Sequence, residues 1–173
     1  MIIKPEKVIK RIIKAVGQKQ PVLIIGDWQE ELIKGIKENQ NSLTQITDNR
    51  KQTSELQDNS FTRIIADYSS LTQLFFNEAR RLLLPTGQII ITAITNEWYL
   101  ERIIRFIKRI PTSSTEGNPI KPKILQDMVH DNGFLIEAYN GYPNGQMLMI
   151  AQIINKEVST LYSSNKQETL TYN

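Results

Sequence analysis

Hydrophobic positions along this chain follow two different periods, and the period changes from one segment to the next. Helical spacing near the amino terminus predicts an amphipathic helix over residues 5–16, with Gly17 as its carboxyl-terminal cap. The apolar residues with this spacing are Val8, Ile9, Ile12, Ile13 and Val16. The next run, PVLIIGD at residues 21–27, is too short for a buried helix and is bounded by Pro and Gly. It predicts a strand that is covered on both faces, as in a parallel sheet.

The two periods alternate through the rest of the chain. Helical spacing predicts further helices over residues 29–38, 70–84, 97–110 and 121–132, the last of them stopped by Gly133. Short apolar runs predict further strands over residues 42–47, 61–67, 88–94, 134–139 and 146–154. Strands that alternate with helices predict an α/β fold with a doubly wound, mostly parallel sheet.

Two short connections add detail to this topology. The segment NGYPNG at residues 140–145 has turn chemistry and is far too short for a parallel crossover, so the last two strands should form an antiparallel hairpin. The segment LPTG at residues 84–87 predicts a turn with Pro85 at its first corner and Gly87 at its exit. The helix before this turn should face inward with Leu71, Leu74, Phe75, Ala79 and Leu82.

Length and composition restrict the class of protein. A chain of 173 residues suits one domain, which we expect over residues 1–155 with the helical segment 1–17 at its start and a flexible polar tail over residues 156–173. No apolar run approaches about 18 residues and the amino terminus lacks a signal peptide, so we expect a cytoplasmic protein without a membrane span. The chain has no Cys and a single His, His130, which argues against metal sites, disulfides and thiol chemistry.

Positive charge is concentrated on two of the predicted helices. Net charge is +3, yet residues 1–20 alone carry six basic residues against Glu6. The basic residues on the outer faces of these two helices are Lys7, Lys10, Arg11 and Lys14 in the first, and Arg102, Arg105 and Arg109 in the segment 97–110. Such a surface either keeps an amphipathic helix solvated or binds nucleic acid or an acidic partner, and the sequence leaves both interpretations open.

One stretch carries a family resemblance. Asp58-Asn59-Ser60-Phe61 leads into a predicted strand, and the following helix ends in Glu78-Ala79-Arg80-Arg81-Leu82-Leu83-Leu84-Pro85-Thr86-Gly87. These two segments resemble those of the class I S-adenosylmethionine (SAM) methyltransferases, in particular the UbiE-like small-molecule enzymes with their "DNSFD" and "ExxRxLxPGG" motifs. Thr86 departs from the second-to-last glycine of that pattern. The closing Gly133-Phe134 and hairpin agree with it, so the resemblance covers residues 5–154.

The resemblance implies a strand order of 2-1-4-5-7-6 in the numbering of the family. Only residues 49–60 separate Asp48, at the end of the second predicted strand, from Phe61, where the family has a helix and a third strand. A full βαβ unit needs about 30 residues or more. We therefore expect a sheet of about six strands without the third one.

The resemblance also places a candidate cofactor site. It implies that Gly26 and Asp27 in the loop after the first strand, and Asp48 after the second, would bind SAM. This loop departs from the family pattern, because Trp28 and Glu30 replace the second and third glycines and Ile24 replaces the acidic residue. A tryptophan at a position of close approach would fill space that the cofactor needs.

Two further pairs are candidates for substrate chemistry. Asp67 and Tyr68 lie at the carboxyl end of a predicted strand, where this fold places catalytic groups, and the aspartate could be a general base. The alternative is that Asp67 caps the next helix. Trp98 and Tyr99 open the segment 97–110 and either line a substrate pocket or pack as part of an amphipathic helix.

Two functions follow from these observations. The chain is either a degenerate, non-catalytic methyltransferase-like domain that binds a partner as a scaffold, or a minimal active SAM-dependent methyltransferase with a small-molecule substrate. The altered glycine loop favours the non-catalytic domain. The intact strand-helix-strand motif is compatible with either function.

Overall fold

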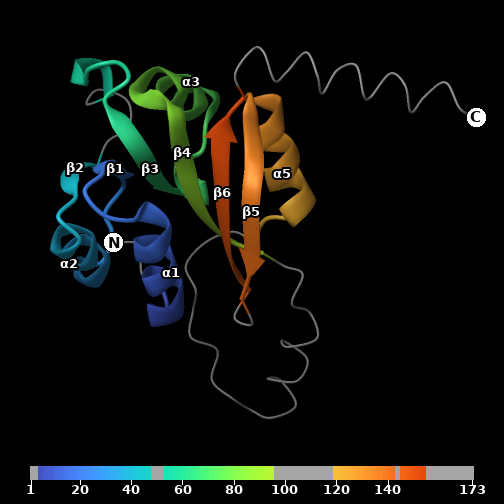
Figure 1. The fold of residues 1–173 in the computed structure, drawn as a ribbon. Helices are drawn as coiled ribbons and strands as arrows, with labels where there is room; N and C mark the ends of the chain where they lie inside the picture. Colours follow the sequence, from blue (N-terminus) through green and yellow to red (C-terminus); the bar gives the residue numbers. More distant parts are fainter. Residues whose placement is uncertain (1–3, 48–52, 96–118, 143–144, 155–173) are drawn as a thin grey trace, which may run out of the picture.

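A computed structural model describes residues 4–47, 53–95, 119–142 and 145–154. Its centre is one six-stranded sheet in the order β2-β1-β3-β4-β6-β5 (Figure 1). The strands are β1 (Pro21–Ile25), β2 (Ser42–Ile46), β3 (Phe61–Asp67), β4 (Leu83–Ile94), β5 (Phe134–Gly141) and β6 (Gln146–Ile153). The first four are mutually parallel, whereas β6 pairs antiparallel with both β4 and β5. The predicted fold class, strand order and closing hairpin are confirmed.

Helices cover the sheet in two layers. They are α1 (Glu6–Val16), α2 (Glu30–Glu38), α3 (Gln73–Leu82) and α5 (Pro122–Asp131), with short 3-10 helices η1 (Thr53–Glu55) and η2 (Tyr68–Ser70). Apolar residues of α1 and α2 form one cluster on the sheet, and those of α3 and α5 form another. None of the helices in the described ranges is long and apolar enough to cross a membrane.

The central strands are apolar at successive positions because each face has its own helical layer. Along β3, Ile64 and Ala66 belong to the cluster with α3 and α5, whereas Ile65 between them belongs to the cluster with α1 and α2. Along β4, Ile89 and Ile90 divide in the same way. All of these side chains are fully buried, which is the reason for the continuous apolar runs in the sequence.

The segment before β4 differs from its prediction in two places. The helix begins only at Gln73, because η2 takes up Tyr68–Ser70 and Thr72 caps the amino terminus by accepting a hydrogen bond from the Phe75 N–H. Leu74, expected to point inward, is 44% exposed, and Phe76 takes a buried place instead. The helical stripe runs through Phe75, Phe76, Ala79 and Leu82, which leaves Leu74 on the flank.

The turn predicted at residues 84–87 is wrong. These residues lie within β4, where the pairing with β3 passes from Phe61 opposite Leu83 to Arg63 opposite Gln88. One residue of β3 therefore faces four residues of β4, and the extra length is absorbed as an irregularity of the strand.

Between β2 and β3 the structure describes residues 53–60, which hold the 3-10 helix η1 and no strand. This agrees with the compressed connection expected from the sequence. The predicted helix over residues 97–110 and the predicted tail over residues 156–173 lie outside the described residues.

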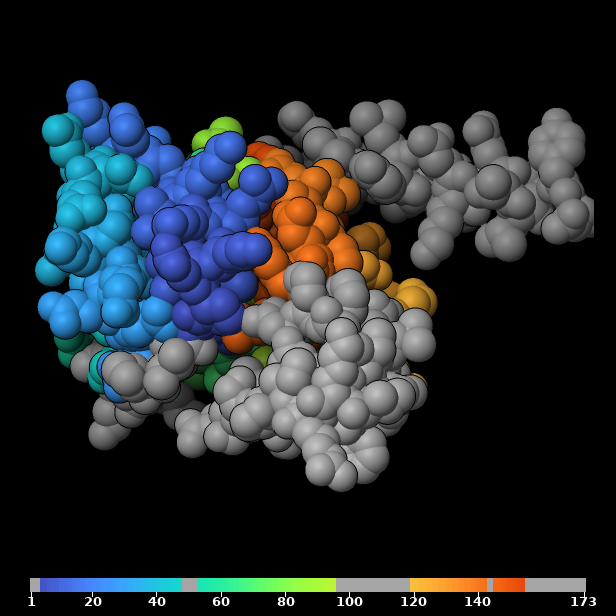
Figure 2. Space-filling model, turned by 90° about the horizontal axis from the view of Figure 1, so that it is seen from below, coloured from blue at the N-terminus to red at the C-terminus, as the bar shows by residue number. Residues whose placement is uncertain are grey.

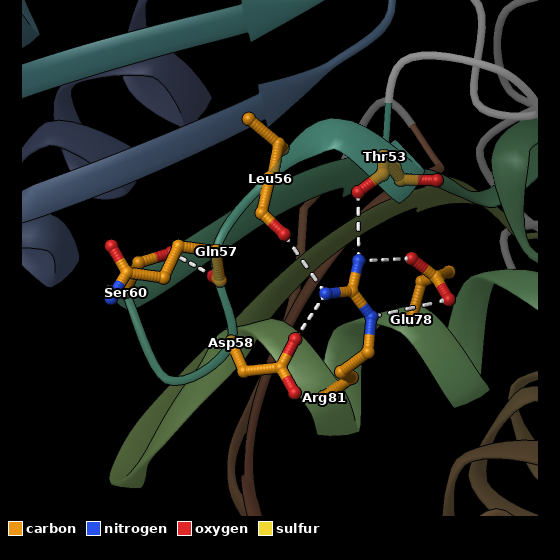
Figure 3. Close-up of polar contacts among 7 residues, drawn as sticks. All are labelled: Thr53, Leu56, Gln57, Asp58, Ser60, Glu78 and Arg81. Carbon is orange, nitrogen blue, oxygen red and sulfur yellow. Dashed lines mark hydrogen bonds and ion pairs between the residues drawn. The ribbon is translucent and has the colours of Figure 1, made fainter.

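Arg81, Asp58 and Glu78, which belong to the segments that carried the family resemblance, lie in a clamp that also includes Thr53 and Leu56 (Figure 3). The Arg81 guanidinium donates to the carbonyl oxygens of Thr53 and Leu56 at 2.7 and 2.9 Å, and it pairs with the carboxylates of Asp58 and Glu78. These carboxylates raise the pKa of Arg81, first through their hydrogen bonds to it. The guanidinium thus fastens residues 53–58 to the end of α3, at the amino ends of β3 and β4.

Arg81→Ala should lower the free energy of unfolding by about 2 kcal/mol, because two backbone carbonyls and two carboxylates lose a charged donor at a side chain that is only 29% exposed. Urea denaturation measures this loss. Arg80→Ala is the matched control, since Arg80 is an exposed neighbour on the same helix, and it should change stability by less than about 0.5 kcal/mol. Equal losses for both variants would contradict the clamp.

Candidate functional site at the carboxyl edge of the sheet

The parallel strands end together at one edge of the sheet, which we call the carboxyl edge. It is formed by the residues that follow Ile25 of β1, by Asp67 at the end of β3 and by the end of β4. In open α/β sheets this is the edge where ligands bind. Because α1 precedes β1 and runs back along the sheet, its amino-terminal end also lies here. Viewed from below, the α1 residues (dark blue) lie between those of α2 (lighter blue) and the carboxyl-terminal elements in orange (Figure 2).

A buried ion pair crosses this edge. The Lys4 ammonium donates to Asp67 Oδ2 at 2.7 Å, and the Thr92 hydroxyl donates to the same oxygen at 2.9 Å. Thr92 lies opposite Asp67 in the β3–β4 pairing, so the sheet itself holds these two side chains together. The Lys4 side chain is 5% exposed and that of Asp67 is 17% exposed. An amine from outside β3 and β4 is thus inserted at their carboxyl ends.

The second oxygen of Asp67 is engaged as well. Asp67 Oδ1 accepts from the Ser69 backbone N–H at 3.2 Å and from the Ser69 hydroxyl at 3.0 Å, which makes Asp67 the amino-terminal cap of η2. Tyr68 lies within η2 and packs, partly buried, against the apolar cluster of α3 and α5. The capping interaction considered from the sequence is therefore present, on a 3-10 turn rather than on α3.

The contacts of Asp67 act on its pKa in opposite directions. Burial alone would raise the pKa of this carboxyl group. The Lys4 charge and the hydrogen bonds from Lys4, Ser69 and Thr92 outweigh burial and hold the pKa below its usual value. Both oxygens of the Asp67 carboxylate therefore accept hydrogen bonds from groups of the protein itself.

The loop after β1 combines one feature expected of a cofactor loop with one that is not. Gly26 has φ of 106°, a conformation that other residues rarely adopt, and its N–H donates to the Ile46 carbonyl at 2.8 Å. Asp27 is exposed. Trp28 is 4% exposed, and its indole N–H donates to the Ile25 carbonyl at 2.9 Å. The indole belongs to the apolar cluster of α1 and α2, so it fills the core on that side of the loop.

Residue 4 is also tied to the start of α2. Its backbone N–H donates to the side-chain oxygen of Gln29, the residue that precedes the first turn of this helix. Lys4 thus contacts the loop after β1 with its backbone and the end of β3 with its ammonium. The segment before α1 bridges the two strands between which ligands enter in this class of fold.

The remaining candidate residues divide between the surface and the undescribed segments. Lys7, Lys10, Arg11 and Lys14 are all exposed on α1, and Lys10 pairs with Glu6 at 2.5 Å. Asp48, Trp98, Tyr99, Arg102, Arg105 and Arg109 lie outside the described residues. Within the described ranges, no group of three His, Asp or Glu side chains is arranged to hold a metal ion.

Comparison with known proteins identifies the fold. No family model and no curated protein matches the chain by sequence. Solved structures do match, among them a SAM-dependent methyltransferase from Archaeoglobus fulgidus with a TM-score of 0.63 and 14% identity, covering 84% of this chain and 91% of that one. A SAM-dependent methyltransferase from Aquifex aeolicus has a TM-score of 0.56 and 16% identity over 88% and 91% of the two chains.

A third similar structure was solved with ligands. It is the 1,6-didemethyltoxoflavin-N1-methyltransferase from Burkholderia thailandensis, with bound 1,6-didemethyltoxoflavin and S-adenosylhomocysteine, at a TM-score of 0.62 and 11% identity over 87% of this chain and 78% of that one. The fold of this chain is therefore that of the class I SAM-dependent methyltransferases. The structural similarity establishes the fold. Sequence identities this low do not establish an activity, which has to be argued from the residues of the site.

Sequence reasoning missed Lys4. It lies just before Pro5 among six basic residues, and neither spacing nor composition separates it from the exposed lysines that follow. Only the return of α1 to the carboxyl edge brings it to Asp67, which is 63 residues further along the chain.

The Asp67 carboxylate should stabilise the fold at neutral pH and lose this effect in acid. Its folded pKa lies below the unfolded value of about 3.9, so its stabilisation is complete above that value and disappears as pH falls through the folded pKa. Urea unfolding of the wild type and of Asp67→Asn, from neutral pH to about pH 2, should give a stability difference that shrinks with acid. A difference independent of pH would contradict this account. Asp127→Asn, at a carboxylate paired on the surface, should have a small effect throughout.

Proposed function

We propose that this chain is a methyltransferase-like domain that acts as a non-catalytic binding or scaffolding module. The observation that carries the proposal is the burial of Trp28 in the loop after β1. In the family that the sequence resembles, this position is a glycine, which lets the backbone approach the cofactor. Here an indole occupies it, anchored to the Ile25 carbonyl and packed into the apolar cluster of α1 and α2.

Two further features support the proposal: the first makes the loop after β1 a poor fit to SAM, and the second engages the candidate catalytic residue. Ile24, which takes the place of the family's acidic residue, is fully buried in the same cluster as Trp28. Asp67, the candidate for acid–base chemistry, accepts from Lys4, Thr92 and Ser69. A site built in this way uses its polar groups for internal contacts, and we derive no catalytic step from it.

A minimal active methyltransferase is the second candidate, and one observation favours it. Gly26 keeps a positive φ, the backbone turn that a glycine-rich cofactor loop needs. In this alternative Gly26, Asp27 and Asp48 would bind SAM, and Asp67 or Tyr68 would contact a small-molecule substrate. Those roles require Lys4 to leave Asp67, whereas the first proposal needs no rearrangement of the described residues.

Titration with SAM and with S-adenosylhomocysteine, by calorimetry on the full chain, separates the two functions. We expect no saturable heat and no rise in melting temperature at about 1 mM ligand. A ligand at about 100 times its Kd would stabilise the fold by about 2.7 kcal/mol, so a micromolar site would be evident in either measurement. Saturable binding that Asp48→Ala weakens would contradict the module and support the enzyme.

The exposed face of α1 is the surface we propose for an anionic partner of this module. Lys7, Arg11 and Lys14 lie along it at helical spacing, beside the paired Lys10. Its inner face packs on the sheet, so the charges are presented on a fixed helix. Cationic ridges of this kind attract polyanions in a salt-dependent manner.

Fluorescence anisotropy with a labelled single-stranded oligonucleotide tests this surface for nucleic acid. We expect binding that weakens as salt rises and that the double variant Lys7→Glu, Lys14→Glu abolishes, because the phosphates are then not neutralised by lysine and their counterions are not released. The control is Lys123→Glu, an exposed lysine on α5 in the opposite layer, which should leave binding unchanged. Binding that is indifferent to the double variant would exclude α1 as the site.

A further inference from the structure

Lys4 is unusual because a lysine ammonium is almost never fully buried in a protein unless it is paired. Its side chain is 5% exposed at an edge of the sheet where the class of fold places ligands. Within the described residues, Asp67 is the carboxylate that pairs with the Lys4 ammonium. The Lys4–Asp67 pair therefore lies at the edge of the sheet where ligands bind in this class of fold.

The acceptor of this ammonium is rigidly built. Asp67 Oδ1 is held by the two donors of Ser69, and Oδ2 is held by the Thr92 hydroxyl on the neighbouring strand. Both carboxylate oxygens are thus oriented by residues of the sheet and of η2. Among the donors to Asp67 in the described residues, only the Lys4 ammonium, which donates to Oδ2 at 2.7 Å, comes from a segment outside β3, η2 and β4.

Lys4 reaches this acceptor from a segment with a second anchor. The backbone N–H of Lys4 donates to Gln29, and α1 begins two residues later. One anchor is on the loop between β1 and α2, and the other is at the end of β3. Lys4 is thus held at two places, by its backbone N–H and by its ammonium, as a bound ligand would be.

We propose that Lys4 is an internal ligand, whose ammonium fills a primary-amine site formed by Asp67 and Thr92 at the carboxyl edge. This inference deepens the non-catalytic function proposed above and rests on it. An enzyme of this fold gains stability from the small molecule that it binds. In this chain the amine of Lys4 supplies the equivalent contact, so that the module needs no small molecule to complete this edge. Asp67 then serves as the acceptor for Lys4 and not as a general base.

Chemical rescue of Lys4→Ala tests the proposal. The substitution leaves the Asp67 carboxylate without its cation and should lower the melting temperature of the full chain by about 10 °C. The probe is n-propylammonium, which has the three carbons and the ammonium that Lys4→Ala removes. We expect it to restore at least about half of the lost melting temperature and to do so saturably, as mass action requires.

Two matched controls separate a site from a general effect of charge. Tetramethylammonium carries the same charge but has no N–H donor, so it should not restore Lys4→Ala. Lys7→Ala, at an exposed lysine in the first turn of α1, should melt as the wild type does and should not respond to propylammonium. Equal rescue by the two cations would overturn the proposal, as would a Lys4→Ala variant that melts as the wild type does.

A second variant keeps the test decisive if Lys4→Ala does not fold. Lys4→Met retains an apolar stem of similar length without the charge, and a double-mutant cycle with Asp67→Asn measures the coupling between the two side chains. Strong coupling supports the internal ligand, and additive effects overturn it.

The outcome is independent of the test for the proposed function. Calorimetry with SAM on the wild type reports whether the domain takes the cofactor, whereas amine rescue reports whether Lys4 occupies a specific site. Rescue together with SAM binding by the wild type would retain the internal amine site and reject the non-catalytic function. Absence of both would reject the internal ligand and leave the module in place.

Discussion

The structure depends on the burial of its central strands on both faces. Ile64 and Ile65 are neighbours in β3, are both fully buried and point into different helical layers. Burying one such side chain contributes about 1.5–3 kcal/mol, so the two layers together outweigh any single polar contact. The same constraint fixes the path of the chain. Because α1 must cover one face of the sheet and lead into β1, its amino terminus lies at the carboxyl edge and brings Lys4 to Asp67.

The ion pair at that edge plays a different part from the apolar layers. A buried pair contributes little net stability, because removing two charges from water offsets much of their attraction. It is costly to break one-sidedly, since the remaining charge is then buried without a partner. Lys4 and Asp67 therefore do not cause the fold, but once the fold exists they hold the segment before α1 across the ends of β1 and β3.

The family resemblance and the candidate site lie at opposite edges of the sheet. Asp58 and Arg81, two residues of the motifs that resemble the family, contact each other where β3 and β4 begin. Their contact joins the segment before β3 to the end of α3, and this structural role does not depend on any activity. For this reason the two motifs indicated the fold correctly and are still compatible with both a non-catalytic module and an active methyltransferase.

Within the described residues, the sequence by itself determined the order of helices and strands and the class of sheet, because apolar period and turn chemistry are local properties. It erred where local signals compete, as at residues 84–87, where pairing with β3 draws a Pro–Thr–Gly segment into β4. It also predicted an altered glycine loop, since Trp28 departs from the glycine that the resemblance implies. Only the tertiary structure decided what these residues contact. The burial of Trp28 depends on α1, and the pairing of Lys4 with Asp67 joins segments 63 residues apart, which no local pattern encodes.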